Sequence, residues 1–265
     1  MAGPGMRLLE VVASERITPN MQRITLGGES MHDFPEGKES ANLKLLLPRA
    51  WQKQPVLEAF RTKSPESPIV RTYTVRSFDA VNKHLVIDFA MHGDGGPASN
   101  WAKHAAVGDT IGVAGPGPIK LDPSHCEWFL VMADMTGLPA ASAFLEKLPA
   151  TAKGMAMFEI TAEEDAQKLN VPEGIEVHWR VHAHPHNPSY AMLDVARALD
   201  WPESMDNVCV FAAAEAHGVK ALRDHVLKER GVPRAQTYLS PYWKIGLVED
   251  QHQQLKREEA KAEEA

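Results

Sequence analysis

The feature that most narrows the fold of this chain is a change of sequence rhythm near residues 115–126. Before this stretch, short strand-like segments follow one another, and breaks containing Pro and Gly separate them. After it, such segments alternate with stretches of helical periodicity. Consecutive short strands favour a β-barrel or sandwich, whereas strands alternating with helices favour a parallel sheet. The sequence therefore predicts an α/β protein of two domains.

The expected elements can be placed by periodicity. The clearest strand lies at 84–91, where Leu85, Ile87, Phe89 and Met91 share one face. The other expected strands are 7–13, 21–26, 43–47, 69–75, 110–115, 127–133, 154–161, 174–181, 206–214 and 235–240, and the expected helices are 136–148, 189–199 and 216–231. We predict an antiparallel β-barrel domain (1–122), a doubly wound parallel domain (123–246) and a charged tail, helical or disordered (247–265).

Composition excludes some classes of partner. The chain of 265 residues has a formal net charge of −7, which argues against a nucleic-acid-binding protein. The first residues lack an apolar stretch of signal-peptide length, and no later run approaches a membrane span. The two cysteines form no disulfide framework. We therefore expect a cytoplasmic protein that binds neither nucleic acid nor membrane.

The segment "RTYTVR" (71–76) is unusually polar for a strand. Alternation places Arg71 and Tyr73 on one face, where a guanidinium suits phosphate oxygens and a ring suits a flat heterocycle. The hydroxyl of Thr74 can bond a ring nitrogen or oxygen. These groups together suit a flavin dinucleotide, although a solvated strand with cross-strand pairs is the alternative.

Two further segments suit phosphate-bearing ligands. In "HGDGGPASNW" (92–101), glycines permit close backbone approach and Pro97 can open a helix, whose N-terminus favours anions. In "ADMTGLPAA" (133–141), a turn follows the first strand of the βα region, where open α/β sheets bind ligands. Each segment has a plainer interpretation, a glycine turn and an ordinary βα turn, and no G-x-G-x-x-G fingerprint is present.

Together with "PYWKIG" (241–246), these three motifs resemble, in order and spacing, the siderophore-interacting protein family. The resemblance covers about residues 7–246. It implies a ferredoxin-reductase-like fold, with FAD on the barrel domain and NAD(P)H on the parallel domain, and the activity of a ferric-siderophore reductase. Asp134-Met135-Thr136 and Ala213-Ala214-Glu215 depart from the family's D-E-T and A-G-E-like turns.

The resemblance also implies roles for individual residues. Arg71 would hold the FAD pyrophosphate, Tyr73 would pack on the isoalloxazine, and Thr74 would bond near its N5 and O4. Thr136 would lie near the nicotinamide and phosphates. The remaining implied cofactor contacts are Thr72, Asp88, His92, Gly96, Pro97, Ala98, Ser99 and Glu215.

Substrate binding is expected to rest on local cations. Ferric catecholate and hydroxycarboxylate siderophores are anionic, whereas a hydroxamate complex is a less charged alternative. Our candidates are Lys44, Arg76 and Lys244, and the alternative for each is a surface cation. The alternating His182, His184 and His186 are not expected to bind a metal, because Pro185 interrupts the strand.

The predicted reaction passes a hydride from NAD(P)H to FAD and then single electrons to siderophore-bound Fe(III), so no catalytic side chain is required. Acids within 158–166 favour NADH by repelling a 2′-phosphate, whereas Arg180 favours NADPH, and the balance tips slightly toward NADH. Three alternatives remain: a ferredoxin-fed reductase, a flavin-containing siderophore-binding protein without turnover, and a generic flavin reductase.

Overall fold

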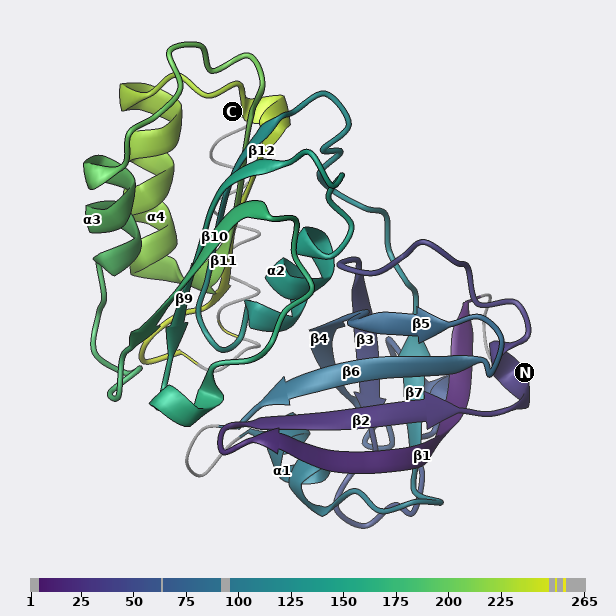
Figure 1. Cartoon of the computed structure of the whole chain (residues 1–265). Helices are drawn as coiled ribbons and strands as arrows, with labels where there is room; N and C mark the ends of the chain where they lie inside the picture. The colour runs from purple at the N-terminus through teal and green to yellow at the C-terminus, as the bar shows by residue number, and fades with distance from the viewer. Residues whose placement is uncertain (1–4, 63, 92–95, 248–250, 252–254, 256–265) are drawn as a thin grey trace. The chain divides into compact units, whose positions relative to one another are not determined.

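The computed structural model describes residues 5–62, 64–91, 96–247, 251 and 255, and it divides into two compact units (Figure 1). The first unit runs up to Lys120 and includes the short segments Ser142–Lys147 and Glu164–Asn170. The second unit contains Leu121–Ala141, Leu148–Glu163 and the chain from Val171 onward. Of the predicted tail, only residues 247, 251 and 255 are described.

The first unit is built on a seven-stranded antiparallel sheet with the strand order β4-β3-β7-β1-β2-β6-β5. Two 3₁₀ turns and one helix complete it: η1 (Glu29–Met31), η2 (Leu57–Ala59) and α1 (Pro97–His104). The strands are β1 (Met6–Thr18), β2 (Met21–Gly27), β3 (Asn42–Leu47), β4 (Ile69–Thr74), β5 (Ser77–Asp79), β6 (His84–Ala90) and β7 (Thr110–Ala114).

The two ends of this sheet meet at residues 75–76. The end strands β4 and β5 are consecutive in the chain, and only Val75 and Arg76 join them. The N–H of Val75 donates to Ala41 O on the β3 side (2.9 Å), whereas the N–H of Arg76 donates to Val86 O in β6 (3.0 Å). The chain therefore changes pairing partner within one peptide, and the sheet closes into the predicted barrel.

A single apolar core fills the barrel. Alternation along each strand turns one row of side chains inward, as the sequence of 84–91 predicts. Helix α1 adds Ala98 and Ala102 to the same core. The strand contributions include Leu9, Val11, Ile24, Leu26, Leu43, Leu45, Leu85, Ile87, Phe89, Ile111 and Val113.

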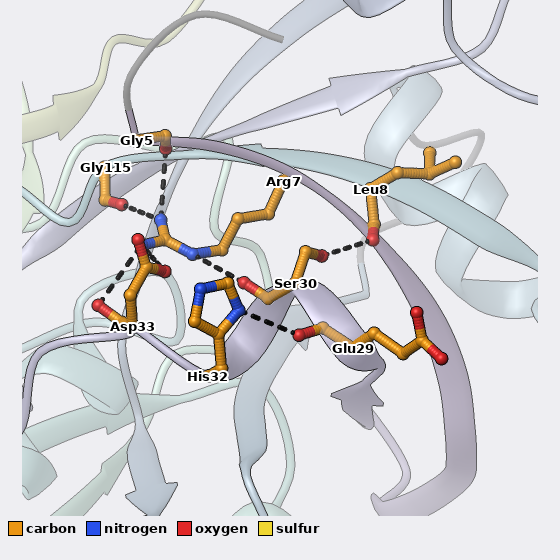
Figure 2. A network of polar contacts seen from close by, with 8 residues as sticks. All are labelled: Gly5, Arg7, Leu8, Glu29, Ser30, His32, Asp33 and Gly115. Carbon is orange, nitrogen blue, oxygen red and sulfur yellow. Dashed lines mark hydrogen bonds and ion pairs between the residues drawn. The ribbon is translucent and has the colours of Figure 1, made fainter. Parts of the chain in front are cut away.

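A buried arginine connects three segments of the barrel unit through hydrogen bonds (Figure 2). Arg7 is 6% exposed and donates to the backbone oxygens of Ser30 (3.1 Å) and Gly115 (2.9 Å) and to Asp33 Oδ1 (2.8 Å). Its guanidinium also lies 5.3 Å from the centre of the Phe34 ring. Because a buried guanidinium must find acceptors, this side chain fixes the start of β1, the turn after η1 and the end of β7.

The second unit is built on a five-stranded parallel sheet with the order β10-β9-β8-β11-β12. This is the doubly wound pattern, and its strand order reverses between β8 and β11. The division between the units runs through α2 (Leu138–Leu145) and η3 (Glu163–Asp165). The other elements of the second unit are β8 (Trp128–Ala133), β9 (Lys153–Ile160), β10 (Gly174–Val181), α3 (Ala191–Ala198), β11 (Val208–Glu215), α4 (Ala216–Asp224), η4 (His225–Glu229, a π-helix), η5 (Arg234–Gln236) and β12 (Thr237–Trp243).

Helices α3 and α4 lie side by side over one face of this sheet (Figure 1). Met192 and Leu222 from these helices pack with Leu130 and Met132 of β8 in one core. The intervening residues of β8 are also fully buried, as the continuous apolar run 127–133 predicts. Within the described part of the chain, no helix is long and apolar enough to cross a bilayer.

Candidate cofactor and substrate site

In the first unit, the candidate residues of "RTYT" pair with β3. Arg71 lies opposite Leu45, and Tyr73 lies opposite Leu43. Opposite residues of an antiparallel pair share a face, so Arg71 and Tyr73 project on the side of the core leucines, as alternation predicts. Thr74 follows them and is 5% exposed.

The other face of the same strand pair carries Lys44 and Thr72. The two residues are directly opposite in the register, and Lys44 Nζ donates to Thr72 Oγ1 at 2.5 Å. A candidate substrate residue and a candidate cofactor residue, 28 positions apart in the sequence, therefore lie in contact.

A chain of aromatic rings connects this strand to the glycine-rich motif. The Tyr73 ring lies 4.4 Å from the Phe89 ring in β6, centre to centre, and Phe89 lies 6.0 Å from Trp101 in α1. Tyr73 remains partly exposed. The fold thus brings "RTYT" and "GPAS" to neighbouring positions of the barrel, although they are distant in the sequence.

Helix α1 begins at Pro97, and Gly96 is its N-cap. Gly96 has no side chain with which to cap the first turn, and the Ser99 hydroxyl donates back to Gly96 O (3.0 Å). A helix N-terminus of this kind favours a phosphate group. These residues fit FAD, because one barrel unit combines a helix start of a kind that favours phosphate, a partly exposed ring and a guanidinium. His92 lies outside the described residues.

Two other candidates are engaged in a charge network. Asp88 is 3% exposed and accepts two hydrogen bonds from Arg23, both 2.7 Å. Arg76 Nε lies 3.7 Å from Asp88 Oδ2. The two terminal nitrogens of Arg76 donate to the two carboxylate oxygens of Glu146 (2.7 Å each). A siderophore contact at Arg76 would compete with Glu146, so this assignment stays a prediction.

In the second unit, Thr136 lies in the turn between β8 and α2, where Asp134 organises the backbone. Asp134 Oδ1 accepts from Thr136 N (2.8 Å), Thr136 Oγ1 (2.6 Å) and Gly137 N (3.2 Å). A Cβ at Gly137 would lie 1.8 Å from Ala213 O, so only glycine lets this turn approach β11.

Glu215 ends β11 and caps α4. Its Oε2 accepts from His217 N (2.6 Å), and its Oε1 accepts from Ile245 N (3.1 Å). Lys244 precedes Ile245 and is partly exposed. The fold therefore places Thr136, Glu215 and Lys244 at the carboxyl ends of β8, β11 and β12, which meet at one edge of the parallel sheet.

This edge is acidic. Burial raises the pKa of Asp134, although hydrogen bonds from Thr136 and Trp243 oppose the shift. Burial likewise raises the pKa of Glu159 in β9, which accepts a bond from Ser189 Oγ (2.5 Å). The pKa of Glu159 is raised further by the nearby charge of Asp134, because like charges disfavour ionisation.

The histidines after β10 make other contacts. His182 Nε2 lies 3.0 Å from Asn187 O, and the His186 ring meets Trp243 edge-on at 5.9 Å. Among the described residues, no group of three His, Cys, Asp or Glu side chains is arranged to hold a metal ion.

Comparison with known proteins places this geometry in a family. Residues 10–119 match the model of the siderophore-interacting FAD-binding domain, and residues 126–246 match the model of the siderophore-interacting protein. The chain belongs to the siderophore-interacting protein family. The resemblance predicted from the motifs is thus confirmed, and so is the FAD-binding nature of the first domain.

Individual relatives agree with the family models. The chain is 33% identical to ferric vibriobactin reductase ViuB of Vibrio cholerae over 251 residues, which cover 92% of this chain and 91% of ViuB. The crystal structure of the siderophore-interacting protein SipS from Aeromonas hydrophila has a TM-score of 0.83 and 31% identity, covering 97% of this chain and 98% of SipS.

A more distant structure confirms the fold class. The ferredoxin reductase of carbazole 1,9a-dioxygenase has a TM-score of 0.65 at 17% identity, and the match covers 92% of this chain and 69% of that chain. The predicted ferredoxin-reductase-like fold of the siderophore-interacting protein is therefore correct.

Sequence reasoning missed two residues of the parallel edge. The motif turns give no role to Asp134 or to Trp243, yet Trp243 Nε1 donates to Asp134 Oδ2 (2.7 Å). The partners are 109 positions apart, so no local pattern reveals the bond. The available signal was the position of an acid directly after a buried parallel strand.

Proposed function

We propose that the chain reduces Fe(III) held by a siderophore, with FAD as resident cofactor and NADH or NADPH as electron source. When bound, FAD supplies the ability to accept a hydride and to release electrons one at a time, which suits a ferric acceptor. Hard oxygen ligands hold Fe(II) less tightly than Fe(III), so reduction favours iron release. The protein's own task is to bind and orient the partners.

The observation that carries the FAD assignment is the ring contact from Tyr73 through Phe89 to Trp101. It joins the strand with the guanidinium of Arg71 to the helix that begins at Pro97. We assign the pyrophosphate to Arg71 and the first turn of α1, and the isoalloxazine to the ring of Tyr73. The Thr74 hydroxyl then holds the polar edge of the isoalloxazine.

We assign substrate binding to Lys44 and Lys244. The protein has a net charge of −7, so an anionic catecholate or hydroxycarboxylate complex needs local cations. The name of the relative ViuB, a ferric vibriobactin reductase, supports siderophore-bound Fe(III) as the substrate. The order of the parallel strands supports a pyridine nucleotide, because such sheets bind dinucleotides where the order reverses.

One observation favours a second electron donor, ferredoxin. The N–H groups of Thr136 and Gly137, which a dinucleotide pyrophosphate would use at this turn, both donate to the Asp134 carboxylate. A protein donor would not need these amides.

Rapid mixing tests the proposal and its rival. We expect the purified protein to be yellow and to release FAD on denaturation. Anaerobic mixing with NADH, NADPH or reduced ferredoxin then shows which donor bleaches the flavin within the turnover time. If only reduced ferredoxin bleaches the flavin, ferredoxin takes the place of NADH or NADPH as the assigned electron donor. A colourless protein that cannot be reconstituted with FAD would refute the flavin assignment.

A further inference from the structure

The carboxylate of Asp134 connects three strand ends. Besides its three bonds to the β8–α2 turn, its Oδ2 accepts from Glu215 N (2.9 Å) at the end of β11 and from Trp243 Nε1 (2.7 Å) at the end of β12. Five donors therefore share two oxygens. A carboxylate has about four lone-pair sites, so the hydrogen-bonding capacity of Asp134 is spent within the protein.

The pairing of β12 with β11 shifts its register just before Trp243. Ala214 pairs with Pro241, but the next residue of β11, Glu215, pairs with Trp243 rather than Tyr242. One extra residue in a strand reverses the face on which the following side chains project. The bond from Trp243 Nε1 to Asp134 Oδ2 therefore forms at the irregular end of β12.

Glu215 holds the residue on the other side of Lys244. Its Oε1 accepts from Ile245 N (3.1 Å), and its side chain is 12% exposed. Lys244 opens a β-turn that the N–H of Leu247 closes by donating to Lys244 O (3.1 Å). Gly246 has a φ of 79°, as the third position of a type II turn requires.

We infer that Asp134 and Glu215 are positioning residues, which hold the 243–245 segment so that Lys244 is presented to the ferric siderophore. Trp243 is fixed by its side chain and Ile245 by its backbone N–H, and the partly exposed Lys244 lies between these two fixed residues. The inference rests on the proposed role of Lys244 in substrate binding. It gives the two acids of the motif turns a task in substrate recognition rather than in contact with the nicotinamide cofactor.

The test combines Trp243→Phe with Lys244→Ala. Trp243→Phe removes the indole N–H but keeps a ring, so the segment loses its bond to Asp134. With an iron(III) tris-catecholate complex as probe, we expect KM to rise about fivefold, which corresponds to about 1 kcal/mol, the net value of an ordinary hydrogen bond. The KM for the electron donor and kcat should stay unchanged.

A matched control separates this effect from general destabilisation. Trp201→Phe removes another indole N–H bond of the same unit, to Ala196 O (2.7 Å), in the core beneath α3. We expect Trp201→Phe to lower the midpoint of thermal unfolding without changing the KM for the tris-catecholate. A rise of KM in both variants would assign the effect to stability and overturn the positioning role.

The double variant decides whether Trp243 acts through Lys244. If it does, Trp243→Phe adds nothing to KM once Lys244 is alanine, since coupled residues are not additive. An equal rise in both backgrounds would overturn the inference. So would an unchanged KM in Trp243→Phe when Lys244→Ala raises it.

An unchanged KM in Lys244→Ala would instead refute the proposed role of Lys244 in substrate binding. Amide hydrogen exchange distinguishes that failure from a failure of the positioning role of Asp134. Trp243→Phe should speed exchange of the Ile245 N–H relative to Trp201→Phe if Asp134 holds the segment. Unchanged exchange there would refute the hold of Asp134 on the segment by itself.

Discussion

The barrel end around Tyr73 and the carboxyl edge around Asp134 hold their motif residues in opposite ways. At the barrel end, the candidate groups are a partly exposed ring and the start of a helix whose cap is a glycine. At the carboxyl edge, the carboxylate of Asp134 accepts bonds from residues 81 and 109 positions away, and that of Glu215 accepts one from a residue 30 positions away. A motif residue can therefore contact the ligand directly, or it can hold the backbone that positions another ligand-binding residue.

The difference follows from the free energy that each kind of side chain loses when it is removed from water. The Tyr73 ring packs against Phe89 and remains partly exposed, which suits a ring that stacks on a flat heterocycle. A carboxylate removed from water must collect donors, and Asp134 collects five of them, none from a cation. Once these bonds are made, the carboxylate serves as a structural cross-link.

The largest expected effect is a loss of stability when the turn at the carboxyl edge is distorted. Gly137→Ala would place a Cβ 1.8 Å from Ala213 O, and the backbone must move to relieve the clash. We expect a loss of about 3 kcal/mol or more in the free energy of unfolding. Gly117→Ala is the control, because its Cβ would meet only Asn42 O at 3.4 Å. Chemical denaturation of both variants measures the difference, and equal losses would contradict the close-approach argument.

The second effect weakens the barrel end. Tyr73→Ala removes the ring assigned to the isoalloxazine, and loss of such stacking costs roughly 1–3 kcal/mol, or about fivefold to 150-fold in FAD affinity. Tyr190→Ala serves as control, since Tyr190 is half exposed in the second unit. Flavin-fluorescence titration gives both dissociation constants. Unaltered FAD affinity in Tyr73→Ala would remove the ring from the site.

The third effect concerns the residue that the carboxyl edge presents. Lys244→Ala should raise KM for an anionic ferric tris-catecholate about tenfold, since a charge-assisted bond is lost. The KM for NADH or NADPH should change little, and a neutral ferric tris-hydroxamate should respond less than the anionic complex. Steady-state kinetics at low and high salt test this, because screening should shrink the difference. Equal changes in KM for donor and ferric complex would argue against the assignment.

The smallest effect is a change in pH dependence. Burial raises the pKa of Glu159 in the folded protein, so ionisation disfavours the folded state. Its stabilising contribution is complete below the unfolded-state pKa and is lost as the pH rises through the folded-state pKa. Glu159→Gln removes this titration, so the variant should gain stability relative to the parent protein as the pH rises through that range. A constant difference across the range would show that Glu159 titrates normally.

Much of the fold could be predicted because its signals are local. The alternation at 84–91 and the apolar run at 127–133 correspond to β6 and β8. The strand expected at 69–75 ends at Thr74, because Val75 and Arg76 form the barrel closure, and the short β5 was missed. The helix expected over 216–231 changes to a π-helix at His225. Closure depends on long-range pairing, which periodicity does not encode.

The candidate site divides in the same way. Arg71 and Tyr73 could be placed on one face because alternation is a local rule. The contact of Lys44 with Thr72 and the bond of Trp243 to Asp134 depend on strand register and on a bulge. The bidentate pairing of Arg76 with Glu146 is likewise a product of tertiary structure. Residue type revealed these groups, but only the fold showed their partners.

The central claim is that electrons pass through FAD to siderophore-bound iron, and iron release measures it most directly. Under anaerobic conditions, the protein is mixed with NADH or NADPH, a ferric tris-catecholate and a chelator that reports Fe(II). The account predicts flavin-dependent formation of about two Fe(II) for each NAD(P)H oxidised, since a hydride carries two electrons and each ferric ion accepts one. The account would be contradicted if the protein bound the ferric complex tightly but formed no Fe(II) with NADH, NADPH or reduced ferredoxin as electron donor.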